Sequence, residues 1–187
     1  MKKFSVKKSP QTIFVALLLT LVALFLGYIL LGMLTMFLFA FGFLGGFILW
    51  LLIPTKVSFS SIKVPYFLAL ALFVGHKLEE RYLDFFPALA KITGVPVPDS
   101  DSLLVYLLLA TAGAWLLIPF LVGRRSQFGY YLAWTFFTSM GITELAHYFL
   151  PFFTGNPYGY FPGMVSVIFL APVAWWGLWR LSRKNTK

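Results

Sequence analysis

Residues 12–53 read TIFVALLLTLVALFLGYILLGMLTMFLFAFGFLGGFILWLLI, without a single charged side chain. As one straight helix this stretch would be about 63 Å long, twice the roughly 30 Å hydrocarbon core of a bilayer. It therefore predicts two membrane-spanning helices that form a hairpin. We expect the chain to reverse near residues 32–35, although no charge marks the turn.

The rest of the chain continues the same pattern, since 60% of its 187 residues are hydrophobic and only 11% are charged. We predict four further spans, and Pro65 suits the first turn of the earliest of them. The fold class is therefore an all-α integral membrane protein, a bundle of about six transmembrane helices with short loops in a single domain. The predicted parts are a basic tail at 1–11, a two-span hairpin at 12–53 and a four-span part at 64–181, whose spans are 64–84, 103–122, 128–150 and 164–181.

The charges predict which ends of the spans face the cytoplasm. With both termini inside, the outer half carries only Lys77, Arg81 and Lys91 of the fifteen basic residues. This asymmetry is the positive-inside pattern of multi-pass membrane proteins, so we predict that both termini are cytoplasmic. The inner basic residues are Lys2, Lys3, Lys7, Lys8, Lys56, Lys63, Arg124, Arg125, Arg180, Arg183, Lys184 and Lys187.

Composition also excludes several classes of protein. The net charge is +9, but no basic face with interleaved aromatics stands outside the spans, so the predicted partners are membrane lipids and not nucleic acid. The chain has no cysteine, which excludes disulfides, thiolate ligands and a cysteine nucleophile. The basic start resembles a signal peptide, but its apolar run is too long and no small-residue cleavage site follows. We expect an uncleaved first helix.

The connection after the third span contains residues 85–92, whose apolar side chains recur at helical spacing. Pro87 lies early enough to occupy a first turn. We expect this segment to lie along the membrane interface as an amphipathic lid over the outer mouth of the bundle.

Two spans carry ionisable residues that the membrane layout does not require. The third contains GHKLEERYLD, in which His76, Glu79 and Glu80 share one helical face. The fifth contains ITELAHYF, in which Glu144 and His147 lie three residues apart. These are both histidines and all three glutamates of the chain, and their depths along the two helices agree. We expect the His76/Glu80 pair and the Glu144/His147 pair to meet within about 6 Å, the range over which charges perturb one another.

Such a cluster suits two kinds of chemistry. Each isolated charge inside a membrane costs about 2.5–3.5 kcal/mol, so its members should be paired. His76, Glu80, Glu144 and His147 could ligate a divalent metal, Zn or Fe, or the cluster could transfer protons as acid and base. Alternatively, Glu79 and Glu80 pair with Lys77 and Arg81 at the membrane surface, and His147 only hydrogen-bonds a loop carbonyl. A haem held by both histidines is a further alternative, which the adjacent glutamates disfavour.

The loop after the fifth span, residues 151–163, is rich in aromatic, Gly and Pro residues. Asn156, Tyr158 and Tyr160 are candidates to line a substrate site there. For Asn156 and Tyr158 the alternative is ordinary turn chemistry, because Asn-Pro and Tyr-Gly are common turn pairs.

The segment His76-Lys77-Leu78-Glu79-Glu80 resembles the motif of the HXXEE family of membrane proteins. A later histidine, His147, followed by Tyr160-Phe161-Pro162-Gly163, extends the resemblance over about residues 64–172. The family pattern implies a further histidine just before the later one, where this chain has Glu144. The resemblance supports these residues as a site and implies no particular reaction. His76 and Glu80 are also similar, by analogy only, to the His and Glu of emopamil-binding sterol isomerases.

Three functions remain open at this level. The first is a small membrane enzyme acting on a lipid or isoprenoid-like, apolar substrate through His76, Glu79, Glu80, Glu144 and His147. The second is a proton-coupled transport or relay protein, in which the same residues titrate along a pathway. The third is a non-catalytic membrane subunit whose polar cluster fixes helix packing. A closed apolar pocket beside the cluster would favour the enzyme.

Overall fold

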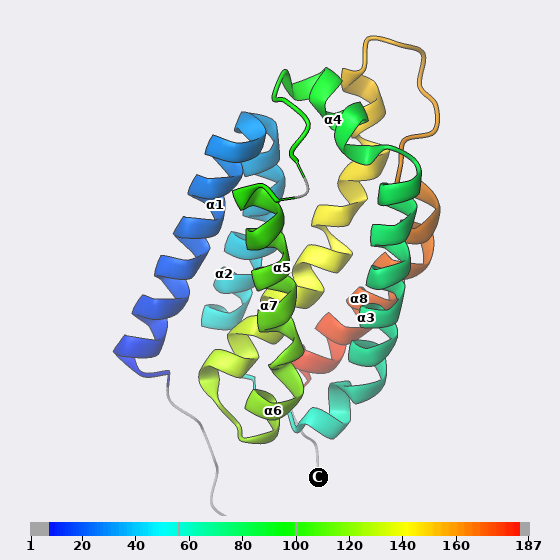
Figure 1. Cartoon of the computed structure of the whole chain (residues 1–187). Coiled ribbons are helices and arrows are strands. Elements are labelled where there is room, and N and C mark those ends of the chain that lie inside the picture. The colour runs from blue at the N-terminus through cyan, green and yellow to red at the C-terminus, as the bar shows by residue number, and fades with distance from the viewer. Residues whose placement is uncertain (1–7, 56, 100, 184–187) are drawn as a thin grey trace, which may run out of the picture.

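The computed structural model describes residues 8–55, 57–99 and 101–183, and within these ranges the chain is helical, with no strand. Its long helices run along one common axis (Figure 1). The short helix α4 and the loop at 154–163 lie at one end of this bundle. The N-terminus of α1, the short helix α6 and the C-terminal end of α8 lie at the other.

The apolar N-terminal stretch forms a hairpin. Helix α1 (Pro10–Phe39) is interrupted at Gly32, whose backbone angles of φ 85° and ψ 176° are not helical. A positive φ favours glycine, and the chain reverses here, within the predicted stretch 32–35 (Figure 1). The returning arm widens into a π-helix, η1 (Ala40–Leu44), and ends with α2 (Gly45–Leu52).

Helix α3 (Phe59–Tyr82) begins five residues before the predicted start at residue 64, so Pro65 lies inside the helix and not in its first turn. A proline cannot donate to the carbonyl four residues earlier, which here belongs to Ser61. The Arg180 side chain donates to that carbonyl at 2.8 Å. This long-range bond explains why the helix continues through Pro65, and it ties α3 to the end of α8.

The predicted span 103–122 contains a break that the sequence analysis did not foresee. Helix α5 (Leu103–Leu116) and α6 (Ile118–Gly123) are separated by Leu117, and Pro119 lies in the first turn of α6. Pro119 leaves the carbonyl of Trp115 without its helical donor, and the Tyr66 hydroxyl donates to it at 3.0 Å. The carbonyl that the proline break leaves free is thereby hydrogen-bonded to a side chain of α3.

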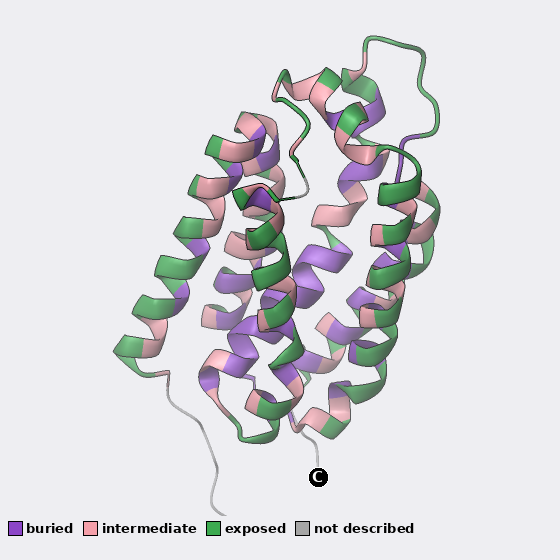
Figure 2. Ribbon diagram, in the orientation of Figure 1, coloured by how far each residue is buried: buried purple, intermediate pink, exposed green. Residues whose placement is uncertain are grey.

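Helix α7 (Gln127–Gly141) is the centre of the bundle, and all its residues except Phe128 are buried (Figure 2). It contacts α1, α2, α3, α5, α6 and α8. The prediction of one helix over 128–150 is wrong, because the α-helix stops at Gly141 and a 3-10 helix follows, η2 (Thr143–Tyr148). The Trp175 indole donates to the Gly141 carbonyl at 2.6 Å and takes the acceptor that an α-helical turn would need.

The remaining elements close one end of the bundle. Helix α4 (Phe85–Thr93) contains Pro87 in its first turn and lies against α1, α3 and the 3-10 helix η3 (Leu150–Phe153). Its buried Leu89 belongs to a small apolar cluster with Leu31 and Phe161. Helix α8 (Met164–Ser182) then returns along α3 and α7. Residues 85–92, the segment expected to be a lid, therefore form α4 and pack against α1, α3 and η3.

Four segments of the described chain are long and apolar enough to cross a membrane: Pro10–Leu52, Phe59–Tyr82, Leu103–Gly123 and Met164–Ser182. The first of these contains the reversal at Gly32. Large apolar side chains are exposed along their outer faces, as in Phe14, Phe25 and Leu109. This distribution of apolar surface is the one expected of a protein whose solvent is lipid.

Candidate metal centre

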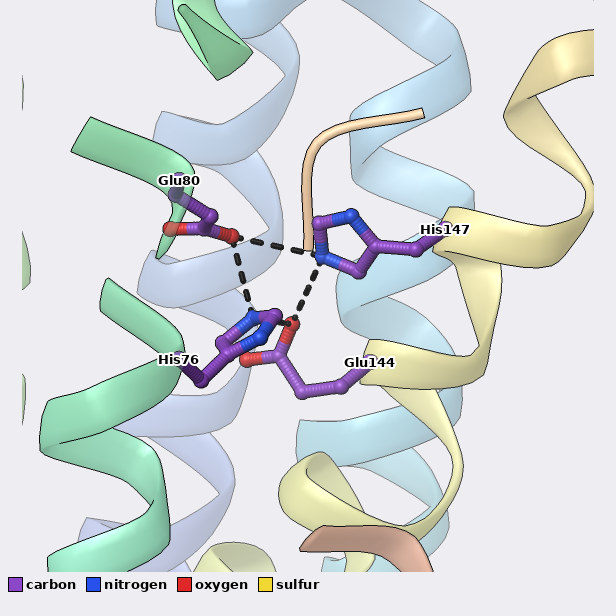
Figure 3. Close-up of side chains that lie close together, drawn as sticks. All are labelled: His76, Glu80, Glu144 and His147. Atoms are coloured by element: carbon purple, nitrogen blue, oxygen red, sulfur yellow. Dashed lines mark hydrogen bonds and ion pairs between the residues drawn. The ribbon is translucent and has the colours of Figure 1, made fainter. Parts of the chain in front are cut away.

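Four side chains from two elements converge inside the bundle. His76 and Glu80 come from α3, and Glu144 and His147 come from η2 (Figure 3). One donor atom from each residue lies within 4.8 Å of all the others, an arrangement that could hold a metal ion. The prediction that the two groups meet within about 6 Å is confirmed.

Local helix geometry explains why each pair points the same way. In an α-helix, residues four apart share a face, which brings His76 and Glu80 of α3 together. In a 3-10 helix there are three residues per turn, so side chains three apart eclipse one another. Glu144 and His147 are three apart in η2 and therefore project to the same side.

The donor atoms alternate between nitrogen and oxygen around a closed ring. Glu80 Oε1 lies 3.1 Å from His76 Nε2 and 3.3 Å from His147 Nε2. Glu144 Oε2 lies 3.1 and 3.3 Å from the same two nitrogens. Donors around a tetrahedral ion with bonds of about 2.0–2.1 Å stand roughly 3.3 Å apart. The four edges of the ring therefore match the spacing of ligands around one small cation, whereas donors across the ring, within 4.8 Å of each other, would move closer together around a tetrahedral ion.

The outer nitrogen of each imidazole is used by the segment that begins α8. His147 Nδ1 forms a short hydrogen bond to the Pro162 carbonyl, which can only accept, so Nδ1 carries the proton. His76 Nδ1 lies 2.7 Å from Ser166 Oγ, and that hydroxyl donates its own proton to the Gly163 carbonyl. With the Ser166 proton directed to that carbonyl, His76 Nδ1 donates to Ser166 Oγ.

This assignment fixes what the inner nitrogens can do. When His76 and His147 are neutral, each Nε2 carries a lone pair directed at carboxylate oxygens of Glu80 and Glu144. Four electron-rich atoms then face one another across about 3 Å. Imidazoles whose outer N–H is held by protein acceptors, with Nε2 directed inward, have the arrangement that histidine metal ligands usually show.

Glu79 does not join this ring. Its carboxylate accepts hydrogen bonds from the backbone N–H groups of Gly163, Val165 and Ser166 at 3.2, 3.1 and 2.7 Å. It also accepts from the Tyr160 hydroxyl at 2.6 Å. A carboxylate at this position complements the unpaired N–H groups and the positive end of the α8 dipole. Partial burial and the bond to Glu79 raise the pKa of Tyr160 to about 12, so its hydroxyl keeps its proton and donates.

Gly163 allows the close approach of this segment to the cluster. Its φ of 99° is in the left-handed region, and a Cβ built on it would lie 2.9 Å from His76 Cε1 and closer still to the His147 ring. The Pro-Gly pair at the start of α8 therefore packs directly on both imidazoles. Phe85 of α4 covers the other side of His147, with ring centroids 5.1 Å apart.

The accessibility of the cluster is uneven. The His76 and His147 side chains are 0% and 3% exposed, and those of Glu80 and Glu144 are 9% and 13% exposed. Lys77 stands at the edge, with 42% of its side chain exposed and its Nζ 2.8 Å from Glu80 Oε2. The ring is thus nearly enclosed, and its accessible corner lies beside an ammonium group.

The predicted substrate-lining residues are only partly at the site. Tyr160 reaches Glu79, whereas Asn156 and Tyr158 lie on the exposed loop and contact other residues of that loop and of the neighbouring η2 and η3 helices. Sequence reasoning missed Ser166, for which no motif gives a signal. Pro162 and Gly163, which the sequence singles out only through the family resemblance, lie against the histidines.

An apolar groove of about 420 Å³ lies on the flank of the bundle, between η1, α2 and α7. Its lining includes Ile142, two residues before Glu144 in the sequence. Single-turn π-helical segments such as η1 are often found at functional sites. Its lining residues are Ala40, Phe41, Leu44, Gly45, Ile48, Leu49, Thr138 and Ile142.

The chain was compared with protein-family models, with curated proteins and with solved structures, and none of the three comparisons gives a match. The geometry of the His/Glu cluster is therefore the basis for a functional assignment.

Proposed function

We propose that this chain is a small multi-pass membrane enzyme with an intramembrane divalent metal centre, acting on a lipid or isoprenoid-like substrate. His76, Glu80, Glu144 and His147 hold the ion in this proposal. The observation that carries it is the closed ring of two Nε2 atoms and two carboxylate oxygens at 3.1–3.3 Å.

The ring needs positive charge to be stable. Glu80 and Glu144 contribute two negative charges, and Lys77 contributes one positive charge at the edge. With both imidazoles protonated on Nδ1, the ring has no proton to share among its four inner donor atoms. One further proton would balance the charge but leave one Nε2 lone pair facing the carboxylates. All four inner donor atoms are satisfied only by two protons, one on each Nε2, or by one divalent cation at the centre.

A single cation is the better solution in this environment. Two protonated imidazoles would place like charges in rings whose centroids are 4.8 Å apart, and both side chains are almost fully buried. Burying each such charge in a low dielectric is costly. One divalent ion supplies the same total charge and contacts all four donors at once.

The donor types indicate the class of metal. Imidazole nitrogen with carboxylate oxygen suits Zn²⁺ and Fe²⁺, and the absence of cysteine from the chain removes soft thiolate ligands. Four protein donors complete a tetrahedral zinc site, whereas iron commonly accepts further ligands. A catalytic role therefore favours an ion that expands to five or six ligands. The ion would supply Lewis acidity toward a substrate oxygen.

The proposed topology is six spans with both termini cytoplasmic. The hairpin of α1 and α2 would provide two spans, α3, α5 with α6, and α8 one each, and α7 with η2 the remaining one. Arg124 and Arg125 follow α6, and Arg180 lies near the end of α8 against Ser61, at the end of the bundle opposite α4 (Figure 1). This grouping of basic residues supports a cytoplasmic assignment for that end.

The apolar character of the substrate rests on two features. The enclosed ring lies among helices long and apolar enough to cross a membrane, and an apolar groove is lined in part by Ile142, two residues before Glu144 in the sequence. The resemblance of residues 76–80 and 160–163 to the HXXEE family adds that these two segments belong to one site. Glu144 would take the place of the histidine that the family pattern implies.

Metal analysis of the purified protein tests the proposal. The protein should be prepared with a histidine-free affinity tag, because a histidine tag binds metal by itself. We expect about one Zn or Fe per chain, and loss of that metal in His76→Ala and His147→Ala. Asp99→Asn removes a carboxylate outside the cluster and should retain the metal. A folded wild-type chain that binds neither metal after incubation with each would overturn the metal centre.

The main rival is acid and base chemistry, or a proton relay, without metal. The hydrogen-bonded ring and the Lys77 ion pair with Glu80 favour it, because they allow protons to be exchanged between neighbouring groups. In that case a metal-free chain should be as stable to heat as a chain incubated with metal. A stabilisation of several degrees that a chelator reverses would instead support the metal centre.

A further inference from the structure

Lys77 is a cation at the accessible edge of the ring. Its side chain is 42% exposed, while the four ring side chains are at most 13% exposed. Of the residues on either side of Lys77, His76 belongs to the ring and Leu78 has an exposed apolar side chain. The Lys77 ammonium is the cationic group that lies beside both ring carboxylates, 2.8 Å from Glu80 Oε2 and 3.6 Å from Glu144 Oε1.

The occupied ring would carry an uncompensated positive charge. This step rests on the proposed metal centre. The ion contributes two positive charges and Lys77 one, and only Glu80 and Glu144 oppose them. The Glu79 carboxylate is already engaged with the start of α8 and the Tyr160 hydroxyl. A net charge of about +1 deep in an apolar bundle is costly, so a site of this kind attracts an anion.

Lys77 has donor capacity left for that anion. An ammonium group has three N–H bonds. One is directed to Glu80 Oε2 at 2.8 Å, while Glu144 Oε1 lies at 3.6 Å, beyond hydrogen-bond distance. The remaining donors can turn toward the exposed side of the chain.

The surroundings of Lys77 suit a hydrocarbon chain. Its Nζ lies 5.2 Å from the centre of the Phe73 ring. Phe73 packs edge-on against Trp115, with centroids 6.0 Å apart, and Trp115 stacks with Phe43 at 6.1 Å. Phe43 in turn contacts Phe39 at 5.9 Å. Phe39, Phe43 and Phe73 are only half-buried, whereas Trp115 is buried beneath them. A row of aromatic rings therefore extends away from the ammonium, with Phe73 and Phe43 as its accessible members.

We infer that the substrate is an anionic amphiphile, whose oxyanion head group binds Lys77 beside the metal and whose apolar chain lies along the half-buried rings of Phe73 and Phe43. Lysine is a common phosphate ligand and acts as a point charge. Dodecyl phosphate is therefore a suitable probe. Dodecanol provides the same chain without the charge, and inorganic phosphate provides the charge without the chain.

Binding to the metal-loaded protein in a maltoside detergent can be followed by tryptophan fluorescence, since Trp115 lies in the row of rings. We expect dodecyl phosphate to bind at least tenfold more tightly than dodecanol or inorganic phosphate. Lys77→Met should weaken dodecyl phosphate binding about ten- to a hundredfold, the usual cost of a lost charged hydrogen bond. Lys77→Arg should retain most of the preference, and Arg81→Met, a charge change on the same helix, should leave it intact.

Metal content measured on the same samples separates the two proposals. A chain without metal fails the proposed function. A metal-loaded wild type that binds dodecanol as tightly as dodecyl phosphate overturns the anionic head group. Equal affinity for inorganic phosphate overturns the lipid chain. An equal loss in Lys77→Met and Arg81→Met would show that general electrostatics, and not contact with Lys77, controls binding.

Discussion

Glu79 and Glu80 are adjacent in the sequence, but their carboxylates serve different parts of the structure. Glu80 Oε1 contacts the Nε2 atoms of His76 and His147 at 3.1 and 3.3 Å. Glu79 turns to the start of α8 and accepts hydrogen bonds from three backbone N–H groups there. One residue therefore provides a donor to the ring, and the other fixes the segment that orients the ring's histidines.

The two glutamates should respond differently to the same substitution. Glu80→Gln removes a charged donor, so we expect metal to be lost from the purified protein. Glu79→Gln keeps an acceptor but loses its charge, and we expect metal to remain with about 10–100-fold weaker affinity, as for other residues that support metal ligands. Competition with a chelator of known affinity measures both. Equal metal loss in the two variants would contradict the division of roles.

Ser166 should act only through the orientation of His76. Ser166→Ala removes the acceptor of His76 Nδ1, 2.7 Å away, and leaves the Glu80 and Glu144 carboxylates in place. We expect metal affinity to fall about tenfold or more, with an unchanged number of metal ions per chain. Ser182→Ala, near the far end of α8, is the matched control. Affinity unchanged in Ser166→Ala would show that this hydroxyl does not position the ring.

A side chain at Gly163 should damage the centre. Gly163→Ala must adopt a φ of 99° and brings a methyl group against both imidazoles. The backbone strain costs about 1–3 kcal/mol, and the displaced rings should also lose metal. Gly155→Ala has a similar strained φ of 72° but open space around it. We therefore expect both variants to lower thermal stability and only Gly163→Ala to lower metal occupancy.

Cysteine labelling can test the proposed topology cleanly, because the chain has no cysteine of its own. In sealed vesicles of known orientation, Ser58→Cys and Ser126→Cys should react with a membrane-impermeant reagent only from the cytoplasmic side. Asp101→Cys and Thr154→Cys should react only from the opposite side. If Ser126→Cys and Thr154→Cys were labelled from the same side, the six-span arrangement would be wrong.

The sequence was sufficient for the parts of the site that depend on helical periodicity alone. His76 and Glu80 share a face because they are four apart in an α-helix. Glu144 and His147 share a face because residues three apart are close in either type of helix. The cost of buried charge then required the two pairs to meet.

The details that depend on long-range contacts could not be predicted. Pro65 lies within α3 because Arg180, far along the chain, supplies a donor for Ser61. Glu79 and His76 both face Ser166, as their shared helical face predicts, but the start of α8 offers Glu79 three N–H groups, so its carboxylate does not join the ring. Such partners are set by tertiary packing, and no local pattern encodes them.

The bond from Trp175 to Gly141 should control the geometry of η2. In an α-helix the Leu145 N–H would donate to the Gly141 carbonyl, but the Trp175 indole occupies that acceptor at 2.6 Å, and Leu145 donates to Ile142 instead. Trp175→Phe frees the carbonyl and permits an α-helical turn. Three residues then span about 300° in place of about 360°, which separates Glu144 and His147 by about 60°.

We expect metal affinity to fall at least tenfold in Trp175→Phe, while Trp179→Phe, on the exposed face of α8, keeps it. Metal titration of the two variants side by side measures this, and equal affinities would mean that packing around η2, and not the indole, holds the 3-10 turn.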